Sequence, residues 1–199
     1  VLVDPNQVSD FKFINGNNWG SDESVANVCS PGNNGNRNFV MGSTSKTLPV
    51  VCFRQCMSCT SDISWIGNNS NFADGNNWTS GWAPSTGCRE VTINSSANNP
   101  VITTGNFSLG NLQLNGGSGI SIASGANLSI CGNVDGAAGW LNGDGNITLN
   151  GASAQTISGS LTSNGAGVLT INNAAGVSLA AGARMEVRNG LKLQNGTFN

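Results

Sequence analysis

The stretch Ile147-Thr148-Leu149 belongs to a pattern that recurs from about Val91 to Asn199. In each copy a small or polar residue stands between two aliphatic ones, and the copies are separated by Gly, Asn, Ala and Ser. Other copies are Ile120-Ser121-Ile122, Leu128-Ser129-Ile130, Leu169-Thr170-Ile171 and Leu191-Lys192-Leu193. An alternation with a period of two residues is typical of a β-strand with one buried face.

Each of these runs is too short to form a stable sheet alone, and the residues between them are turn formers. A solenoid solves both problems, because stacked coils bury the aliphatic residues in one continuous interior. We therefore predict a right-handed parallel β-helix over residues 91–199. Asn residues at its corners are expected to stack from coil to coil through their amides.

The composition limits the classes of function that we expect for this chain. Charged residues are 9% of the 199 residues, the net charge is -2, and His is absent. A basic surface for nucleic acid is therefore not expected. The sequence contains no run of eighteen apolar residues, so a membrane-spanning helix is not expected either. Neither end of the sequence carries a start or stop signal, so we expect a piece of a larger polypeptide.

The chain contains an even number of cysteines, at Cys29, Cys52, Cys56, Cys59, Cys88 and Cys131. In a turn-rich chain with little charge, this predicts disulfides and an oxidising, extracellular setting. Six cysteines allow fifteen pairings. Proximity in sequence favours disulfides between Cys29 and Cys52 and between Cys56 and Cys59, but the other pairings stay open. A zinc site built from Cys52, Cys56, Cys59 and Cys88 is an alternative.

Residues 1–59 have a different pattern. Strands are expected over Asp10–Ile14, Arg37–Met41 and Leu48–Phe53, joined by long connections rich in Asn and Gly, and three such strands predict part of a β-sandwich. Trp19 stands between Asn18 and Gly20, where one face of the indole is expected to be exposed. Such a face can stack on a pyranose ring, or it can pack on neighbouring protein.

Three segments of this region resemble the C-terminal half of a starch-binding-type carbohydrate-binding module. They are Phe11-Lys12-Phe13-Ile14, Trp19-Gly20-Ser21-Asp22-Glu23 and Asn36-Arg37-Asn38-Phe39-Val40. The resemblance implies that Trp19 is a sugar-stacking platform with Asp22 and Asn36 as polar neighbours. A longer insertion that contains a cysteine, Val25 to Gly35, departs from the family pattern.

Residues 60–90 form a junction that contains Trp65, Trp78 and Trp82. Because the open first coil of a solenoid needs a cover, these aromatic residues are expected to cap it. Trp78 and Trp82 are also candidates for sugar binding.

The junction and the coils together resemble the β-helical repeats of large Bacteroidota surface proteins exported by the type IX secretion system. The resemblance is carried by Trp65, Gly67, Asn77, Trp78, Gly81, Pro84, Val91, Ile93, Pro100, Ile102, Leu112 and Leu114, and by the later segments Ala154–Gly159 and Leu169–Ala174. It implies a scaffold and says little about activity.

The acidic residues do not form a catalytic pattern. From Val91 onward the only acids are Asp135, Asp144 and Glu186, and the first two stand beside Gly as turn residues do. Calcium has two weak candidate sites, Asp74–Asn77 and Asp22-Glu23, neither of which matches an EF-hand loop. We therefore predict no catalytic residues and no cofactor, with structural calcium left open.

Together these patterns predict an extracellular structural or adhesive segment of a bacterial surface protein, with the solenoid as stalk or scaffold. Expected partners are glycans or other surface and matrix proteins, and the secretion machinery during export. The alternatives are a glycan-binding module with Trp19 as platform and, more distantly, an accessory region of a carbohydrate-active enzyme whose catalytic domain lies elsewhere.

Overall fold

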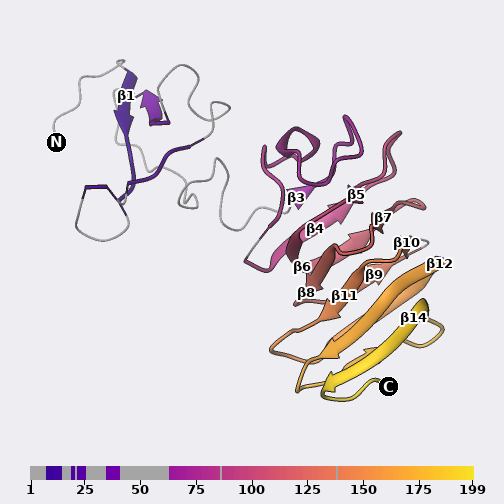
Figure 1. Cartoon of the computed structure of the whole chain (residues 1–199). Coiled ribbons are helices and arrows are strands. Elements are labelled where there is room, and N and C mark those ends of the chain that lie inside the picture. Colours follow the sequence, from indigo (N-terminus) through magenta and orange to yellow (C-terminus); the bar gives the residue numbers. More distant parts are fainter. Residues whose placement is uncertain are drawn as a thin grey trace. The chain divides into compact units, whose positions relative to one another are not determined.

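The computed structural model describes residues 8–14, 19–20, 22–25, 35–40, 63–85, 87–137 and 139–199. Its contacts divide the chain into two compact units, Val1–Ser61 and Asp62–Asn199. The division falls close to the expected end of the N-terminal region at residue 59. The two units can be followed in Figure 1 and are described separately below.

In the N-terminal unit, the described strands are β1 (Val8–Phe11) and β2 (Arg37–Val40). They pair antiparallel, with Phe11 opposite Arg37. A β-bridge joins Ile14 to Asp22. The expected third strand, over residues 48–53, lies outside the described residues, so the partial β-sandwich stays a prediction.

The second unit is a β-solenoid of about 5 turns, as the repeated pattern predicts. Its only described helix is the short 3-10 turn η1 (Gly75–Asn77). Its strands are β3 (Ile63–Ser64), β4 (Arg89–Ile93), β5 (Val101–Ile102), β6 (Asn106–Leu114), β7 (Gly119–Ile122), β8 (Asn127–Ile130), β9 (Val134–Gly136), β10 (Trp140–Asn142), β11 (Asn146–Leu149), β12 (Gln155–Asn172), β13 (Val177–Leu179) and β14 (Arg184–Asn195).

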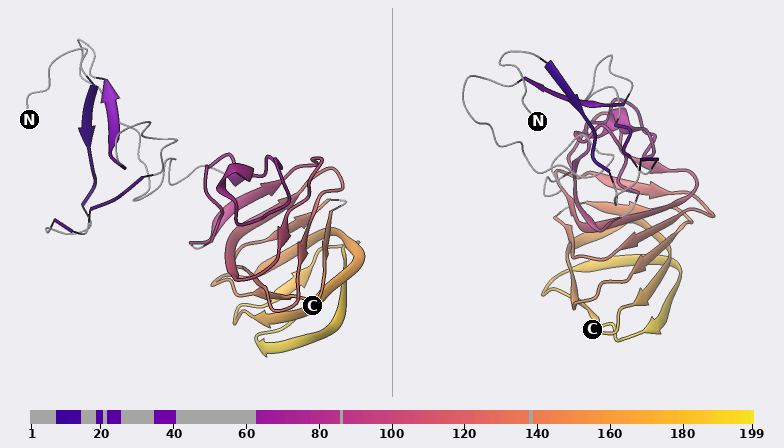
Figure 2. Two further views of the ribbon diagram at one scale, coloured as in Figure 1. Left: turned by 45° about the horizontal axis from the view of Figure 1, so that its top comes forward. Right: turned by 90° about the vertical axis from the view of Figure 1, so that its left-hand side faces the viewer.

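Neighbouring coils pair in parallel and in register, so that like residues stack in columns (Figure 2). Two inward columns run through β6, β8, β11, β12 and β14. They are Phe107–Leu128–Ile147–Leu169–Leu191 and Leu109–Ile130–Leu149–Ile171–Leu193. A third column on another side is Ile63–Val91–Leu112–Val134–Ile157–Leu179.

These columns are the core. Leu128, Ile147 and Leu169 are all fully buried, and each buried aliphatic side chain contributes about 1.5–3 kcal/mol relative to an exposed one. The polar residue between two aliphatic ones points outward, which explains the alternation in the sequence.

The amides of corner asparagines stack along the same side of the solenoid, as expected. Asn127 Nδ2 donates to Asn106 Oδ1 at 2.7 Å, and Asn146 Nδ2 donates to Asn127 Oδ1 at 2.9 Å. The ladder repeats the register of the strands in side-chain hydrogen bonds.

The solenoid begins earlier than the pattern indicates. β3 pairs with β4 in the large sheet, so residues of the expected 60–90 junction form the first coil. Trp140 starts β10, and its ring covers Gly119 of β7. A Cβ at Gly119 would lie 2.1 Å from Cδ2 of Trp140, so the position requires Gly.

Aromatic residues close the N-terminal end of the solenoid, which is the capping role expected of the junction. Trp78 contacts Trp65 and Phe72 edge-on, with ring centroids 4.9 Å apart in both pairs. Phe72 in turn contacts Phe107, which packs against the core. Trp65, Phe72 and Trp78, named the aromatic cap below, are at most 3% exposed.

A disulfide joins Cys88, which precedes β4, to Cys131, which follows β8. The Cα atoms are 5.9 Å apart, and 43 positions separate the two residues in sequence. The bond confirms that these two cysteines pair and excludes Cys88 from the alternative zinc site. Cys29, Cys52, Cys56 and Cys59 lie outside the described residues.

Candidate functional site

Trp19 is the most exposed of the large hydrophobic residues in the described parts of the chain, at 78%. It lies in a turn together with Gly20, whose φ of 101° lies in the region that favours glycine. The expectation of an exposed indole is therefore confirmed. An exposed indole offers a flat apolar face to a ligand, so Trp19 is a candidate for binding.

Asp22 lies beside this turn and is held by an ion pair. Lys12 Nζ lies 3.0 Å from Asp22 Oδ2, and the backbone N–H of Gly20 donates to Oδ1 at 3.3 Å. The hydrogen bond from Lys12 is the main reason why the pKa of Asp22 is lowered from 3.8. Asp22 is thus a carboxylate at neutral pH and can accept hydrogen bonds from hydroxyl groups.

A buried ion pair fixes the backbone that carries these residues. Glu23 is fully buried and accepts hydrogen bonds from Arg37 Nε at 2.5 Å, from Arg37 Nη2 at 2.8 Å and from the backbone N–H of Phe13 at 3.1 Å. The guanidinium also lies over the Phe13 ring, 5.3 Å from its centroid. Glu23 therefore ties the Trp19 turn to both β2 and the segment after β1.

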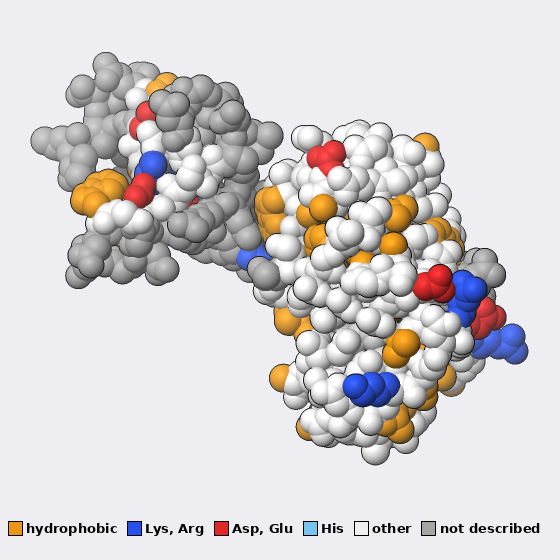
Figure 3. All heavy atoms as spheres, in the orientation of Figure 1, with side chains coloured by type: hydrophobic (Ala, Val, Ile, Leu, Met, Phe, Trp, Pro, Cys, Tyr) orange, Lys and Arg blue, Asp and Glu red, His pale blue; other side chains and the backbone are white. Residues whose placement is uncertain are grey.

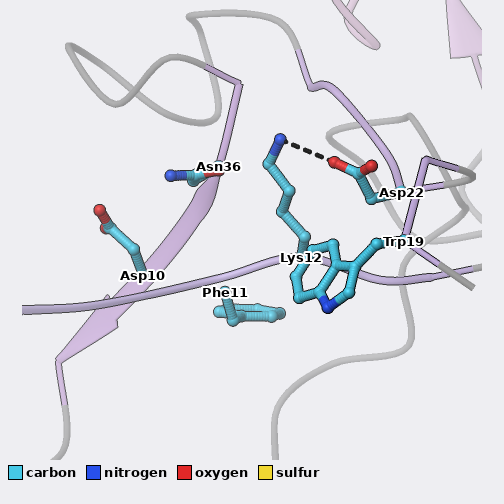
Figure 4. Close-up of a pocket in the computed structure, with 6 residues that line it drawn as sticks. All are labelled: Asp10, Phe11, Lys12, Trp19, Asp22 and Asn36. Atoms are coloured by element: carbon cyan, nitrogen blue, oxygen red, sulfur yellow. Dashed lines mark hydrogen bonds and ion pairs between the residues drawn. The ribbon is translucent and has the colours of Figure 1, made fainter.

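The residues around Trp19 line an open surface hollow of about 270 Å³. Figure 4 shows the six residues that line it, with Lys12 reaching to Asp22. They are Asp10, Phe11, Lys12, Trp19, Asp22 and Asn36. The structure thus brings Trp19, Asp22 and Asn36, the three residues expected from sequence, to one place.

Asp10, Phe11 and Lys12 also line the hollow and were not expected from the sequence. A signal for them was present in the sequence, which places Asn36 directly before the second expected strand. In the structure Phe11 lies opposite Arg37, the first residue of β2. An expected antiparallel pairing of the two strands would have placed them beside Asn36.

The hollow combines a flat indole and a phenyl ring with two carboxylates, an ammonium group and an amide. This set suits a carbohydrate, whose apolar ring face stacks on the indole while its hydroxyls bond the polar groups. It does not suit glycoside hydrolysis with Asp22 as the acid, since a general acid needs a raised pKa and the pKa of Asp22 is lowered.

Trp78 does not fit the sugar-binding role that the sequence left open for it. It is 1% exposed, its indole N–H donates to the Phe72 carbonyl at 2.8 Å, and two aromatic rings contact it. It therefore offers no free face to a ligand. Trp82 is partly buried and packs against the core.

The acids of the solenoid are dispersed. Asp135 accepts a hydrogen bond from the Ser158 hydroxyl at 3.0 Å, whereas Asp144 lies 3.6 Å from Arg188 in an exposed ion pair. Nothing in these contacts pairs Asp135 with Asp144 across the coils.

The two calcium candidates have engaged oxygens. Asp74 caps η1 by accepting from the Asn76 N–H and also accepts from Asn69 Nδ2, while Asp22 and Glu23 are bound to Lys12 and Arg37. No cluster of three or more His, Cys, Asp or Glu residues occurs in the described parts of the chain. The carboxylates of both candidates thus already have partners within the protein.

Comparison with known proteins gives no match to any family model, curated protein or solved structure. The two resemblances noted in the sequence therefore stay predictions. Among the residues that the structure describes, no helix is long and apolar enough to cross a membrane.

Proposed function

We propose that this chain is an extracellular adhesive segment in which the N-terminal unit binds glycans around Trp19 and the solenoid serves as a scaffold or stalk. The observation that carries the proposal is the 78% exposure of Trp19 at a hollow that Asp22 and Asn36 also line. An exposed indole beside a carboxylate and an amide is a common arrangement for binding a sugar ring.

The rigidity of the recognition site supports the proposal. Asp22 is positioned by Lys12 on one side and Gly20 on the other, and the next residue, Glu23, is anchored to Arg37. A site whose groups are already held in place loses less conformational entropy when a ligand binds.

The scaffold role rests on what the coils are made of. Their interior is aliphatic, their described acids do not converge, and neighbouring coils repeat in register. Such repetition supplies length and a stable surface, which is how solenoids commonly serve as binding scaffolds.

An extracellular location is supported by the Cys88–Cys131 disulfide, because disulfides persist in oxidising compartments. The resemblance to type IX-secreted surface proteins agrees with export by that route. A structural role without ligand binding is the other candidate, favoured by the small number of charged side chains on the face that Figure 3 shows. An accessory role beside a catalytic domain would use the same Trp19 site.

The test is isothermal titration calorimetry with maltohexaose, cellohexaose and mannohexaose as probes. We expect saturable binding of at least one of them with a Kd in the millimolar range or tighter, and a loss of at least tenfold in Trp19→Ala. Calorimetry is preferable to fluorescence here, since Trp19→Ala also removes the reporting indole.

Val8→Ala is the matched control, since Val8 is 63% exposed in the same unit but does not line the hollow. Its affinity should equal that of the unchanged chain. Absence of binding to all three probes at millimolar concentration would leave only the structural role. Binding that survives Trp19→Ala would remove Trp19 from the site.

A further inference from the structure

Two residues that line the Trp19 hollow stand next to a buried ion pair in the sequence. Asp22 precedes Glu23, and Asn36 precedes Arg37. Glu23 is fully buried and Arg37 is 6% exposed, whereas Asp22 and Asn36 are partly exposed. Because successive side chains of an extended chain point to opposite sides, burial of the ion pair turns its two neighbours toward the surface. Glu23 and Arg37 are named the anchor pair below.

The anchor pair links the two stretches of chain that carry these neighbours, which lie on either side of Lys12 in the view of Figure 4. Arg37 donates through Nε to Oε1 of Glu23 and through Nη2 to Oε2. Such a bidentate contact fixes orientation as well as distance. The backbone adds a second link, because the Val25 N–H donates to the Gly35 carbonyl at 3.0 Å. The span between the two neighbours is therefore set beneath the hollow, away from any ligand.

The same guanidinium supports a third lining residue. Arg37 lies over the Phe13 ring, 5.3 Å from its centroid, and Phe13 meets Phe11 edge-on with centroids 5.6 Å apart. The Phe13 backbone is also bound to Glu23: its N–H donates to Glu23 Oε1 at 3.1 Å, and its carbonyl accepts from the Glu23 N–H at 3.0 Å. The anchor pair thus supports three of the six lining residues without lining the hollow itself.

Stability alone does not require an ion pair at this place. Removing two charges from water offsets much of their attraction, and apolar residues of similar volume often replace a buried pair without loss of stability. What apolar residues lack is the directed, two-point contact between a guanidinium and a carboxylate. Orientation is therefore the property that an ion pair adds here.

We infer that the anchor pair positions the Trp19 site: it holds Phe11, Asp22 and Asn36 in place before a ligand arrives. This inference rests on the proposed glycan binding. A sugar must meet a carboxylate and an amide at the same time, and every group that is ordered only on binding lowers the affinity. With their span fixed in advance, Asp22 and Asn36 contact hydroxyl groups at two separate places on one ligand.

A double-mutant cycle separates positioning from folding. Glu23→Gln with Arg37→Met, named the neutral variant, removes both charges, while the Gln oxygen can still accept from the Phe13 N–H. Calorimetry uses the full chain and whichever of maltohexaose, cellohexaose and mannohexaose binds it most tightly. The neutral variant should bind this probe at least about tenfold more weakly, because its lining groups are ordered only on binding.

Asn36→Ala is then measured in both backgrounds. It should weaken binding at least about tenfold in the unchanged chain but less than about twofold in the neutral variant, where Asn36 is no longer held in place. A pair that only stabilised the fold would give the same loss in both. Val8→Ala is the control, because Val8 is 63% exposed and does not line the hollow, and it should leave the affinity unchanged in both backgrounds.

A second variant covers the case in which the neutral variant does not fold. Arg37→Lys keeps the positive charge but loses the two-pronged contact with Glu23, so it should weaken binding by at least about threefold. Circular dichroism and urea unfolding establish that each variant is folded under the conditions of the titration.

The free protein supplies a readout that needs no ligand. Backbone ¹⁵N order parameters of Asp22 and Asn36 should be about 0.85 in the unchanged chain, as in a rigid backbone, and should fall to about 0.6 in the neutral variant. Arg37→Lys should lower them in the same direction.

Three outcomes would overturn the inference: equal losses from Asn36→Ala in both backgrounds, full affinity in a folded variant of the anchor pair, or order parameters that the substitutions leave unchanged. Failure of the proposed function looks different, since the unchanged chain would then bind none of the three probes. In that case the order parameters alone decide whether the anchor pair holds Asp22 and Asn36 in place.

Discussion

Trp19 and Trp78 are each the last residue of a Gly-Asn-Asn-Trp tetrapeptide, at residues 16–19 and 75–78. Trp19 is 78% exposed, whereas Trp78 is 1% exposed. The difference lies in what each turn meets. Phe72, Trp65 and the first coil surround Trp78, while Trp19 has Lys12 and Asp22 beside it. The local sequence is the same in both places, so the tertiary surroundings decide which indole is in the core and which is on the surface.

Asn77, the residue before Trp78, shows how the turn of the aromatic cap is held. Asn77 is buried, and its side chain bonds to Asn69 and to the Asn71 carbonyl, so the turn is held from inside. In the N-terminal unit the ion pairs Glu23–Arg37 and Lys12–Asp22 hold the chain near Trp19. One region is stabilised by apolar burial with satisfied amides, the other by charge pairs.

The contrast between the two tryptophans is tested by replacing each of them in turn with Ala and measuring stability. Trp78→Ala should lower the free energy of unfolding of the solenoid by about 3–5 kcal/mol, because it leaves a cavity in the aromatic cap. Trp19→Ala should change stability by less than about 0.5 kcal/mol, as a surface substitution does. Urea unfolding followed by circular dichroism measures both, and similar losses in the two variants would contradict the contrast.

The disulfide gives the next largest expected effect and belongs to the solenoid alone. Replacing Cys88 and Cys131 together by Ala should lower the free energy of unfolding by about 2–4 kcal/mol, since it releases a constraint across 43 positions of the unfolded chain. The double variant is compared with the unchanged chain without reductant, and glycan binding at Trp19 serves as the control. A stability loss below about 0.5 kcal/mol would show that the coils need no such tie.

Much of the solenoid could be predicted because its causes are local and repeated. The alternation Leu128-Ser129-Ile130 predicts which side chains point into the core. The asparagines between such runs indicate where a ladder of side-chain amides can form. The pairing of Cys88 with Cys131 could not be predicted, since fifteen pairings of six cysteines are open and only the fold brings these two together. The place of Trp140 could not be predicted either, because Gly119, which makes room for it, lies a full coil earlier.

The candidate site was predictable in part for a similar reason. Trp19, Asp22 and Asn36 stand in motifs that the resemblance selects, whereas Asp10 and Phe11 join them only through the pairing of β1 with β2. The burial of Trp78 depends on Phe72 and on coils further along the chain, so its local sequence could not separate it from Trp19.

The smallest expected effect compares Asp22 with Asp74, one acid from each unit. The pKa of each carboxyl is lowered from 3.8, but by different neighbours: chiefly the Lys12 side chain for Asp22, and the neutral Asn69 side chain and the Asn76 N–H for Asp74. A lowered pKa in the folded state means that the carboxylate stabilises the fold above the unfolded pKa. That contribution is lost as the pH falls through the folded value.

Salt separates the two causes, because it screens an exposed charge pair more than hydrogen bonds from amides. Raising NaCl from about 0.02 to 1 M should move the pKa of Asp22 upward toward 3.8 and leave that of Asp74 nearly unchanged. Lys12→Met should produce a similar rise for Asp22 at low salt. Carboxyl carbon chemical shifts followed by NMR between about pH 2 and 6 report both residues in one sample. Equal salt responses would mean that charge pairing is not what distinguishes the Trp19 turn from the turn of the aromatic cap.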